Sequence, residues 1–186
     1  MTEEYFIEYS APTLAGIKTA NLFSCDYQDK SEVVKDIRRF NDILVKRGIR
    51  VIPVRYFHHR VLIYVYRPSF LTRDLCDENS SRLLERMGYD TSNTDKCVSK
   101  LCMKLSRLSS SSDFPHEVGL FLGYPPEDVR GFMEDPHSGY RCVGFWKVYG
   151  DVEKSQRCFE RIRKCRQIYY KQWTMGKSVE HLTVSA

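Results

Sequence analysis

The stretch from Asp113 to Phe132 constrains the fold most strongly, because prolines and glycines divide it into two short helices. Pro115 suits the first turn of the earlier helix, where the N–H that proline lacks would have no intrahelical partner. Gly123 can adopt the left-handed conformation that ends this helix, and Pro126 opens the next one. The sequence therefore predicts two helices that are joined by a tight turn.

Several common kinds of site are excluded. His116-Glu117 begins the zinc-protease pattern, but Leu120 stands where that pattern requires a second histidine. A helix-turn-helix would bring the second predicted helix against DNA phosphates, yet that helix is mainly acidic. The chain has neither a glycine-rich phosphate loop nor a Gly-x-Ser-x-Gly elbow. The motifs therefore identify no reaction.

A chain of 186 residues is long enough to bury a core, and we expect one domain over residues 1–186. Its 42% hydrophobic and 28% charged residues are typical of a soluble globular protein. No apolar run is long enough to cross a membrane, and the acidic beginning Met1–Tyr5 lacks a signal-peptide pattern. We therefore expect a cytoplasmic protein. The run Ser109–Ser112 is expected to be a flexible connector within the domain.

The seven cysteines are odd in number and include no Cys-x-x-Cys pair. The spacings from Cys97 to Cys102 and from Cys158 to Cys165 do not match a zinc knuckle. In a cytosolic chain such cysteines most often stay reduced and pack as small apolar residues. The sequence therefore predicts no metal site, and it indicates no particular cofactor.

The periodicity of apolar residues predicts an α+β fold. Strands are expected at Ala20–Cys25, Arg50–Tyr56, Arg60–Tyr66 and Tyr140–Tyr149, with Phe57-His58-His59 as the tip of a hairpin. Longer helices are expected at Ser31–Arg47, Leu71–Met87, Thr94–Leu108 and Val152–Trp173, followed by a docked tail at Ser178–Val184. This order favours a small, mainly antiparallel sheet, a hairpin plus two further strands, covered by about five or six helices.

Local signals refine this prediction. Pro53 has no N–H donor, which indicates an edge strand or a bulge. Ser31 is expected to cap its helix and Gly48 to end it. The run Ala11–Ser24 is expected to form a capped turn that leads into the first strand, although polar residues within it could instead contact a ligand.

A basic stripe is predicted on the last helix, where like charges recur at spacings of three and four. A neighbouring apolar stripe should pack inward and thereby turn the basic stripe outward. Such a face fits solvent exposure or an acidic protein partner, and nucleic acid is the least favoured reading. The basic stripe is Lys154, Arg157, Arg161 and Lys164, and the apolar stripe is Cys158, Ile162, Cys165 and Tyr169.

Five runs of the chain resemble a known family: Ala11–Lys18, Tyr64–Pro68, Phe114–Pro125, Trp146–Gly150 and Leu182–Val184. They are similar to the bacterial family catalogued as domain of unknown function 3793, which is found mainly in anaerobic Firmicutes. The resemblance runs in matching order across nearly the whole chain. It implies no activity and no catalytic residues, because none is established for the family. Cys158 and the Ser109–Ser112 run depart from the family's pattern.

The resemblance also implies a genomic neighbourhood of flavodoxin and iron-uptake genes. Flavodoxins are strongly acidic, and an outward basic stripe would attract such a partner electrostatically. We therefore expect a binding or accessory protein of iron or redox physiology. In this hypothesis an acidic partner such as flavodoxin docks on the basic stripe of the last helix.

The alternative is a small-molecule enzyme or a binder of an anionic ligand. Lys18, Arg67, His116 and Glu117 lie at the edges of predicted elements, where sites are often built. His116 and Glu117 would be the catalytic acid–base groups, and Lys18, Asn21 and Arg67 would bind the ligand. The competing interpretation gives each residue a local role at a helix start, a turn or a hairpin end.

Overall fold

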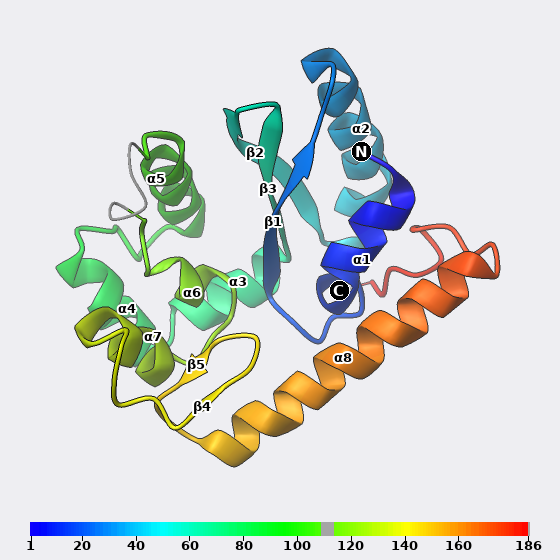
Figure 1. Ribbon diagram of the computed structural model, residues 1–186. Helices are drawn as coiled ribbons and strands as arrows, with labels where there is room; N and C mark the ends of the chain where they lie inside the picture. Colours follow the sequence, from blue (N-terminus) through cyan, green and yellow to red (C-terminus); the bar gives the residue numbers. More distant parts are fainter. Residues whose placement is uncertain (109–113, 186) are drawn as a thin grey trace.

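The computed structural model describes residues 1–108 and 114–185 and has the predicted α+β fold (Figure 1). The predicted connector at Ser109–Ser112 lies outside the described residues. The strands are β1 (Ala20–Asp26), β2 (Arg50–Phe57), β3 (Arg60–Tyr66), β4 (Cys142–Val143) and β5 (Lys147–Val148). The helices are α1 (Glu3–Leu14), α2 (Lys30–Leu44), the 3-10 turn η1 (Val45–Arg47), α3 (Pro68–Leu75), α4 (Glu78–Arg86), α5 (Thr94–Ser106), α6 (Val118–Phe121), α7 (Pro126–Glu134) and α8 (Val152–Thr174).

The main sheet has three antiparallel strands in the order β1-β3-β2, so that β3 is central. The side chains of β3 alternate between two hydrophobic cores, as the two-residue period of a strand requires. Ile63 and Val65 belong to the core that α1 and α2 cover, whereas Tyr64 and Tyr66 belong to the core built with α3 to α7. Figure 1 shows the sheet between these two groups of helices. The covering of both faces explains why β3 is almost continuously apolar.

The predicted hairpin between β2 and β3 is confirmed. His58 and His59 at its tip have φ angles of 42° and 60°, as the favoured two-residue hairpin turn requires. The β2–β3 register shifts between Pro53 and Arg55, and β2 is an edge strand. Pro53 therefore stands where a missing N–H costs least, as predicted.

Two predicted elements are divided in the structure. The helix predicted at Leu71–Met87 is two helices, because the Asp77 carboxylate accepts hydrogen bonds from the backbone N–H groups of Asn79 and Ser80. This cap starts α4 after a break in the chain direction. The strand predicted at Tyr140–Tyr149 is a small hairpin of β4 and β5, separate from the main sheet.

Two helix starts and one helix end also differ from the prediction. Asp29 caps α2, and its carboxylate accepts a hydrogen bond of 2.7 Å from the backbone N–H of Ser31, the predicted cap. The predicted turn at the beginning of Ala11–Ser24 is the end of α1, which contains Pro12. The earlier short helix, α6, begins at Val118 rather than at Pro115, because a preceding turn uses the Pro115 carbonyl.

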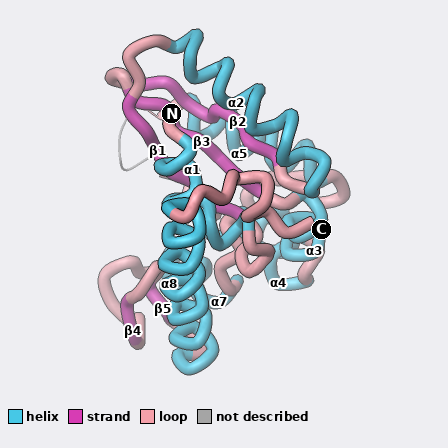
Figure 2. The backbone as a smooth tube through the Cα atoms, turned by 90° about the vertical axis from the view of Figure 1, so that its right-hand side faces the viewer, coloured by secondary structure: helices cyan, strands magenta, loops and turns pink. Residues whose placement is uncertain are grey.

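The long helix α8 matches its predicted range closely and connects both parts of the structure (Figures 1 and 2). The C-terminal half of α8 packs against α1, where Arg166 pairs with Glu8 at 3.7 Å. Near the start of α8, Phe159 contacts Trp146 of the β4–β5 hairpin. The predicted docked tail follows, and the backbone N–H of Val184 donates to the Leu14 carbonyl at 3.0 Å. Within residues 1–108 and 114–185, no helix combines the length and apolar character needed to span a membrane.

Arg67 lies between these segments with a side chain that is only 1% exposed. Its guanidinium donates to the backbone carbonyls of Thr13 at 2.7 Å, Leu14 at 2.8 Å and Val184 at 2.6 Å, with a longer contact of 3.4 Å to Arg47. The planar fork of donors allows one side chain to reach several carbonyls. Arg67 therefore joins the end of α1, the end of η1 and the C-terminal tail.

Replacing this guanidinium tests its structural role. We expect Arg67→Met to lower the free energy of unfolding by about 3 kcal/mol, because buried carbonyls lose their donors. The measurement is urea unfolding followed by circular dichroism. Arg82→Met is the matched control, since Arg82 is exposed and pairs with Glu78 on the helix surface, and it should change stability by less than about 0.5 kcal/mol. Equal effects of the two substitutions would contradict the assignment.

Candidate functional site

A cavity of about 850 Å³, which we call the main cavity, is formed where several segments meet. The α1–β1 loop contributes Lys18, and the turn between α6 and α7 contributes Tyr124. Helix α8 contributes Lys154, Cys158 and Arg161. The remaining walls come from α3, the start of α4 and the β4–β5 hairpin. A volume of this size is typical of small-molecule sites.

The end of α1 determines where Lys18 lies. The Pro12 carbonyl accepts hydrogen bonds from the backbone N–H groups of Ile17 at 3.0 Å and Lys18 at 3.1 Å. Gly16 precedes them with a φ of 68°, a conformation that glycine adopts without steric cost. The loop is therefore tied to the helix, and Lys18 is presented from a defined backbone position.

A close approach between two loops brings Tyr124 to the same wall. A Cβ atom at Gly123 would lie only 2.7 Å from the hydroxyl oxygen of Thr19, and Gly123 also has a φ of 75°. Only glycine fits both requirements. The approach leaves the Lys18 Nζ atom 5.1 Å from the centre of the Tyr124 ring.

Tyr124 is also stacked on Trp146, with 4.5 Å between the ring centres and 26° between the ring planes. The Trp146 indole N–H donates to Asp128 at 2.7 Å. The same buried carboxylate accepts the backbone N–H groups of Tyr149 at 2.7 Å and Gly150 at 2.8 Å. Asp128 therefore holds the β4–β5 hairpin in place. Through Trp146 it also holds the stacked pair of Tyr124 and Trp146, which we call the aromatic wall.

Three cations lie around one thiol in the main cavity. Lys18, Lys154 and Arg161 each favour the thiolate of Cys158, although burial outweighs them and raises the pKa of that thiol. Burial also lowers the pKa of Lys18 to about 8, because the charged amine loses water contacts. Among the residues that the structure describes, none of these three cations forms an ion pair with a carboxylate.

Most other charges of the cavity are already engaged. Arg73 pairs with Asp74 at 2.8 Å, and Asp74 also accepts a hydrogen bond from the Thr19 hydroxyl. Asp77 caps α4 through its carboxylate. Glu127, at the start of α7, is the remaining acidic residue of the lining. The wall formed by α8 and the α1–β1 loop is therefore positively charged.

The basic stripe predicted on α8 is exposed along its whole length, at Lys154, Arg157, Arg161 and Lys164. Two of these residues, Lys154 and Arg161, also line the main cavity, while Arg157 and Lys164 do not. The apolar stripe beside it packs inward through Ile162 and Cys165. The partner-binding role of the basic stripe stays a prediction.

The structure does not bring Lys18, Arg67, His116 and Glu117 into one cavity. Lys18 lines the main cavity and also a smaller one of about 130 Å³, which it shares with Asn21. Asn21 accepts a hydrogen bond of 2.7 Å from the Thr13 hydroxyl. The guanidinium of Arg67 is directed instead to backbone carbonyls.

His116 and Glu117 point to different surroundings. His116 is exposed and lines a separate, largely apolar cavity of about 350 Å³, with its ring 5.0 Å from that of Phe132. Glu117 is 1% exposed and accepts hydrogen bonds from the Tyr89 hydroxyl at 2.9 Å and from Lys104 Nζ at 2.5 Å. Glu117 is therefore bonded to α5 through Lys104. His116 lines a different cavity, so the two side chains do not form a common acid–base pair.

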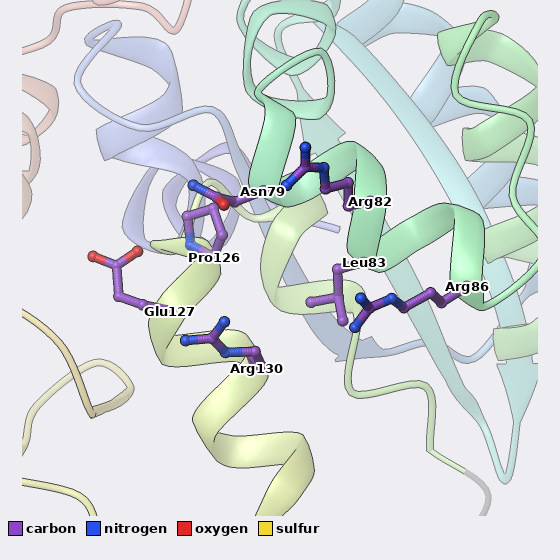
Figure 3. A pocket seen from close by; sticks show the side chains of 7 residues that line it. All are labelled: Asn79, Arg82, Leu83, Arg86, Pro126, Glu127 and Arg130. Carbon is purple, nitrogen blue, oxygen red and sulfur yellow. The ribbon is translucent and has the colours of Figure 1, made fainter.

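A further hollow of about 220 Å³ lies between α4 and α7 (Figure 3). Arg82 and Arg86 extend into it from α4, and Arg130 comes from α7. The carboxylates of Glu78 and Glu134 pair with Arg82 and Arg130, and all three arginines are exposed. Water solvates such a surface, so we do not include it in the site. Over the described part of the chain, no three His, Cys, Asp or Glu side chains are grouped as metal ligands.

The aromatic wall and its support were missed in the sequence. Tyr124 and Trp146 are far apart in the chain, and nothing in the local pattern pairs them. Both lie within the runs that resemble the family, which was the available signal. Asp128 looked like an ordinary acidic residue in the first turn of α7, and Cys158 looked like a core residue.

The role of Asp128 can be tested through the emission of Trp146. We expect Asp128→Ala to lower the free energy of unfolding by about 3 kcal/mol, because three donors lose their acceptor. In a Trp173→Phe background, where Trp146 is the remaining tryptophan, its emission should shift to longer wavelength as the hairpin loosens. Asp135→Ala, at an exposed carboxylate, is the control. An unchanged Trp146 emission would show that Asp128 does not hold the wall.

Comparison with known proteins gives one match. The model of the family described as "Protein of unknown function (DUF3793)" matches residues 6–183. Neither the search of curated proteins nor the search of solved structures found a match. The family model covers nearly the whole chain, including the main cavity, and it confirms the resemblance seen in the sequence. The chain belongs to the DUF3793 family.

Proposed function

We propose that the protein binds a small, planar, anionic ligand in the main cavity. The observation that carries this proposal is the group of Lys18, Lys154 and Arg161, which face the cavity without a carboxylate partner among the described residues. Like charges that share one wall repel one another, and a bound anion relieves this repulsion. A phosphate or carboxylate group is the chemistry that these side chains recognise best.

The aromatic wall supports a planar ligand. Tyr124 and Trp146 are only half-buried and line the main cavity beside Lys18. Aromatic side chains favour offset stacking against planar rings, which adds affinity beyond the area that is buried. The ligand expected here therefore combines a flat ring with a phosphate or carboxylate group.

Pyridoxamine 5′-phosphate is a suitable probe, because it has one aromatic ring and one phosphate. Isothermal titration calorimetry should detect binding of this probe and weaker binding of pyridoxamine, which lacks the phosphate. We expect the double substitution Lys154→Ala with Arg161→Ala to weaken binding of the phosphate form by tenfold or more, about 1.4 kcal/mol. The affinity should also fall as the pH rises above about 8, because Lys18 then loses its charge.

A matched control lies on the same helix. Arg157→Ala with Lys164→Ala removes the same charge from α8 but leaves the lining of the main cavity intact. This pair should change the affinity by less than about twofold at 150 mM salt, where distant surface charges are screened. Equal losses in both pairs, or no binding of the probe at millimolar concentration, would contradict the proposal.

A second candidate function is the docking of an acidic protein, such as a flavodoxin, in iron or redox physiology of the cytoplasm. The exposed basic stripe of α8 supports it, since complementary charge steers association. Within the described residues, Arg157 is the member of this stripe that pairs with a carboxylate, that of Glu153 at 3.4 Å. Arg157 and Lys164 therefore distinguish the two functions, because they serve docking but not the main cavity.

Purified flavodoxin is the probe for docking. Arg157→Glu with Lys164→Glu should abolish an interaction measured by biolayer interferometry at 50 mM salt, and raising the salt to 300 mM should weaken it in the wild type. Lys35→Glu with Arg38→Glu places the same charge change on exposed residues of α2 and should have little effect. Binding that is insensitive to both salt and charge reversal on α8 would exclude this docking mode.

A further inference from the structure

We propose that Lys18 holds its ligand covalently, by condensation of the lysine ε-amine with an aldehyde group of the ligand to form an imine. This inference rests on the ligand-binding function proposed above and specifies its chemistry. The ligand class is an aldehyde on a planar ring that also carries a phosphate or carboxylate group.

The position of Lys18 supports this chemistry. Lys18 lines both the main cavity and the smaller cavity of about 130 Å³. Its backbone is fixed by the Pro12 carbonyl, and its Nζ atom lies beside the Tyr124 ring. In the described part of the chain it forms neither an ion pair nor a hydrogen bond that would occupy the amine.

The charge state of the amine is also suitable. Only the neutral amine has the lone pair that attacks a carbonyl carbon. Because burial lowers the pKa of Lys18 to about 8, about half of the amine is neutral at pH 8, against less than about 1% for a lysine of ordinary pKa. The titratable and charged groups that line the two cavities with it are Tyr9, Arg73, Asp74, Cys76, Asp77, Tyr124, Glu127, Lys154, Cys158, Arg161 and Arg166.

The reaction balances without an oxidant or a reductant. The neutral amine nitrogen forms a bond to the carbonyl carbon, the C=O π pair moves to the oxygen, and one N–H proton is transferred to that oxygen. The resulting carbinolamine loses its hydroxyl group together with the second N–H proton as water, which leaves the imine. Two protonated groups lie near the amine. Burial raises the pKa of Tyr124 to about 12 and also raises that of Cys158, so that both stay protonated at neutral pH and can offer a hydrogen bond to the carbonyl oxygen.

The surrounding side chains orient such a ligand. Lys154 and Arg161 lie on the α8 side of the main cavity, where they can bind the anionic group. Tyr124 and Trp146 line the same cavity and give it aromatic surface against which the ring can pack. An aldehyde on the same ring is then brought within reach of Lys18, and this proximity favours condensation over reaction with exposed lysines.

Pyridoxal 5′-phosphate is the test probe, because it carries a ring, a phosphate and an aldehyde. The protein is incubated with one equivalent of the probe, the imine is reduced with borohydride, and the modified lysine is located by peptide mass spectrometry. We expect one adduct, at Lys18, that Lys18→Arg abolishes. Lys147→Arg, at another half-buried lysine beside an aromatic ring, should leave the adduct unchanged. The initial trapping rate should rise about 50-fold from pH 6 to pH 8 and then level off.

Pyridoxamine 5′-phosphate has no aldehyde, so it can occupy the main cavity but cannot form an imine. It therefore tests ligand binding separately from the condensation at Lys18. If this probe binds but pyridoxal 5′-phosphate gives only scattered adducts on exposed lysines, the imine is excluded and anion binding stands. If neither probe binds, both proposals fail. Lys18→Arg should keep the circular-dichroism spectrum and the urea-unfolding midpoint of the wild type. Loss of the adduct in this folded variant, with an intact adduct in Lys147→Arg, assigns the condensation to Lys18.

Discussion

A buried guanidinium that binds backbone carbonyls holds together the segments on which the rest of the structure depends. Arg67 reaches the end of α1 through the carbonyls of Thr13 and Leu14, and the tail through Val184. The turn that it fastens continues directly into the loop that presents Lys18. The position of the candidate ligand-binding lysine is therefore coupled to the core through the chain itself.

The protein treats its buried charges in two different ways. Arg67 is satisfied by carbonyls, and Glu117 is satisfied by Lys104 and the Tyr89 hydroxyl, so both contribute to the packing of their core. Lys18 is left without a carboxylate among the described residues, although burial disfavours its charged form. The charged Lys18 amine loses water contacts on burial without gaining a carboxylate partner in the part of the chain that the structure describes, and Lys18 lines a cavity. Such a residue is a candidate for function rather than for packing.

Elements with a long and strongly periodic pattern could be predicted from the sequence. The ends of α8 and of the β2–β3 hairpin agree with the prediction within a residue, because the packing follows the apolar pattern there. The break before α4 was missed, because it depends on the Asp77 cap within a segment that is otherwise consistent with one helix. The strand predicted at Tyr140–Tyr149 was wrong because a few alternating residues do not reveal a turn at their centre.

The candidate site was less predictable than the fold. The sequence pattern marks Lys18, Arg67 and Glu117 as candidate site residues, because each is a charged residue within an apolar run. The pattern does not determine which groups each side chain contacts. That depends on long-range neighbours: carbonyls from the tail for Arg67, a lysine of α5 for Glu117, and a cavity for Lys18. The pairing of Tyr124 with Trp146 likewise follows from the tertiary arrangement alone.

The bonds between Arg67 and the tail have a consequence for how the chain is made. Arg67 and α1 leave the ribosome early, but one of the carbonyls that satisfies the guanidinium belongs to Val184. Helix α8, which covers α1, is also synthesised late. The first half of the protein therefore stays incompletely packed during translation. Helix α1 lacks its contacts with α8, and Arg67 lacks the Val184 carbonyl, until the end of the chain is synthesised. Contacts that are so distant in sequence form slowly, so early release of a truncated chain would leave this region exposed to aggregation or proteolysis.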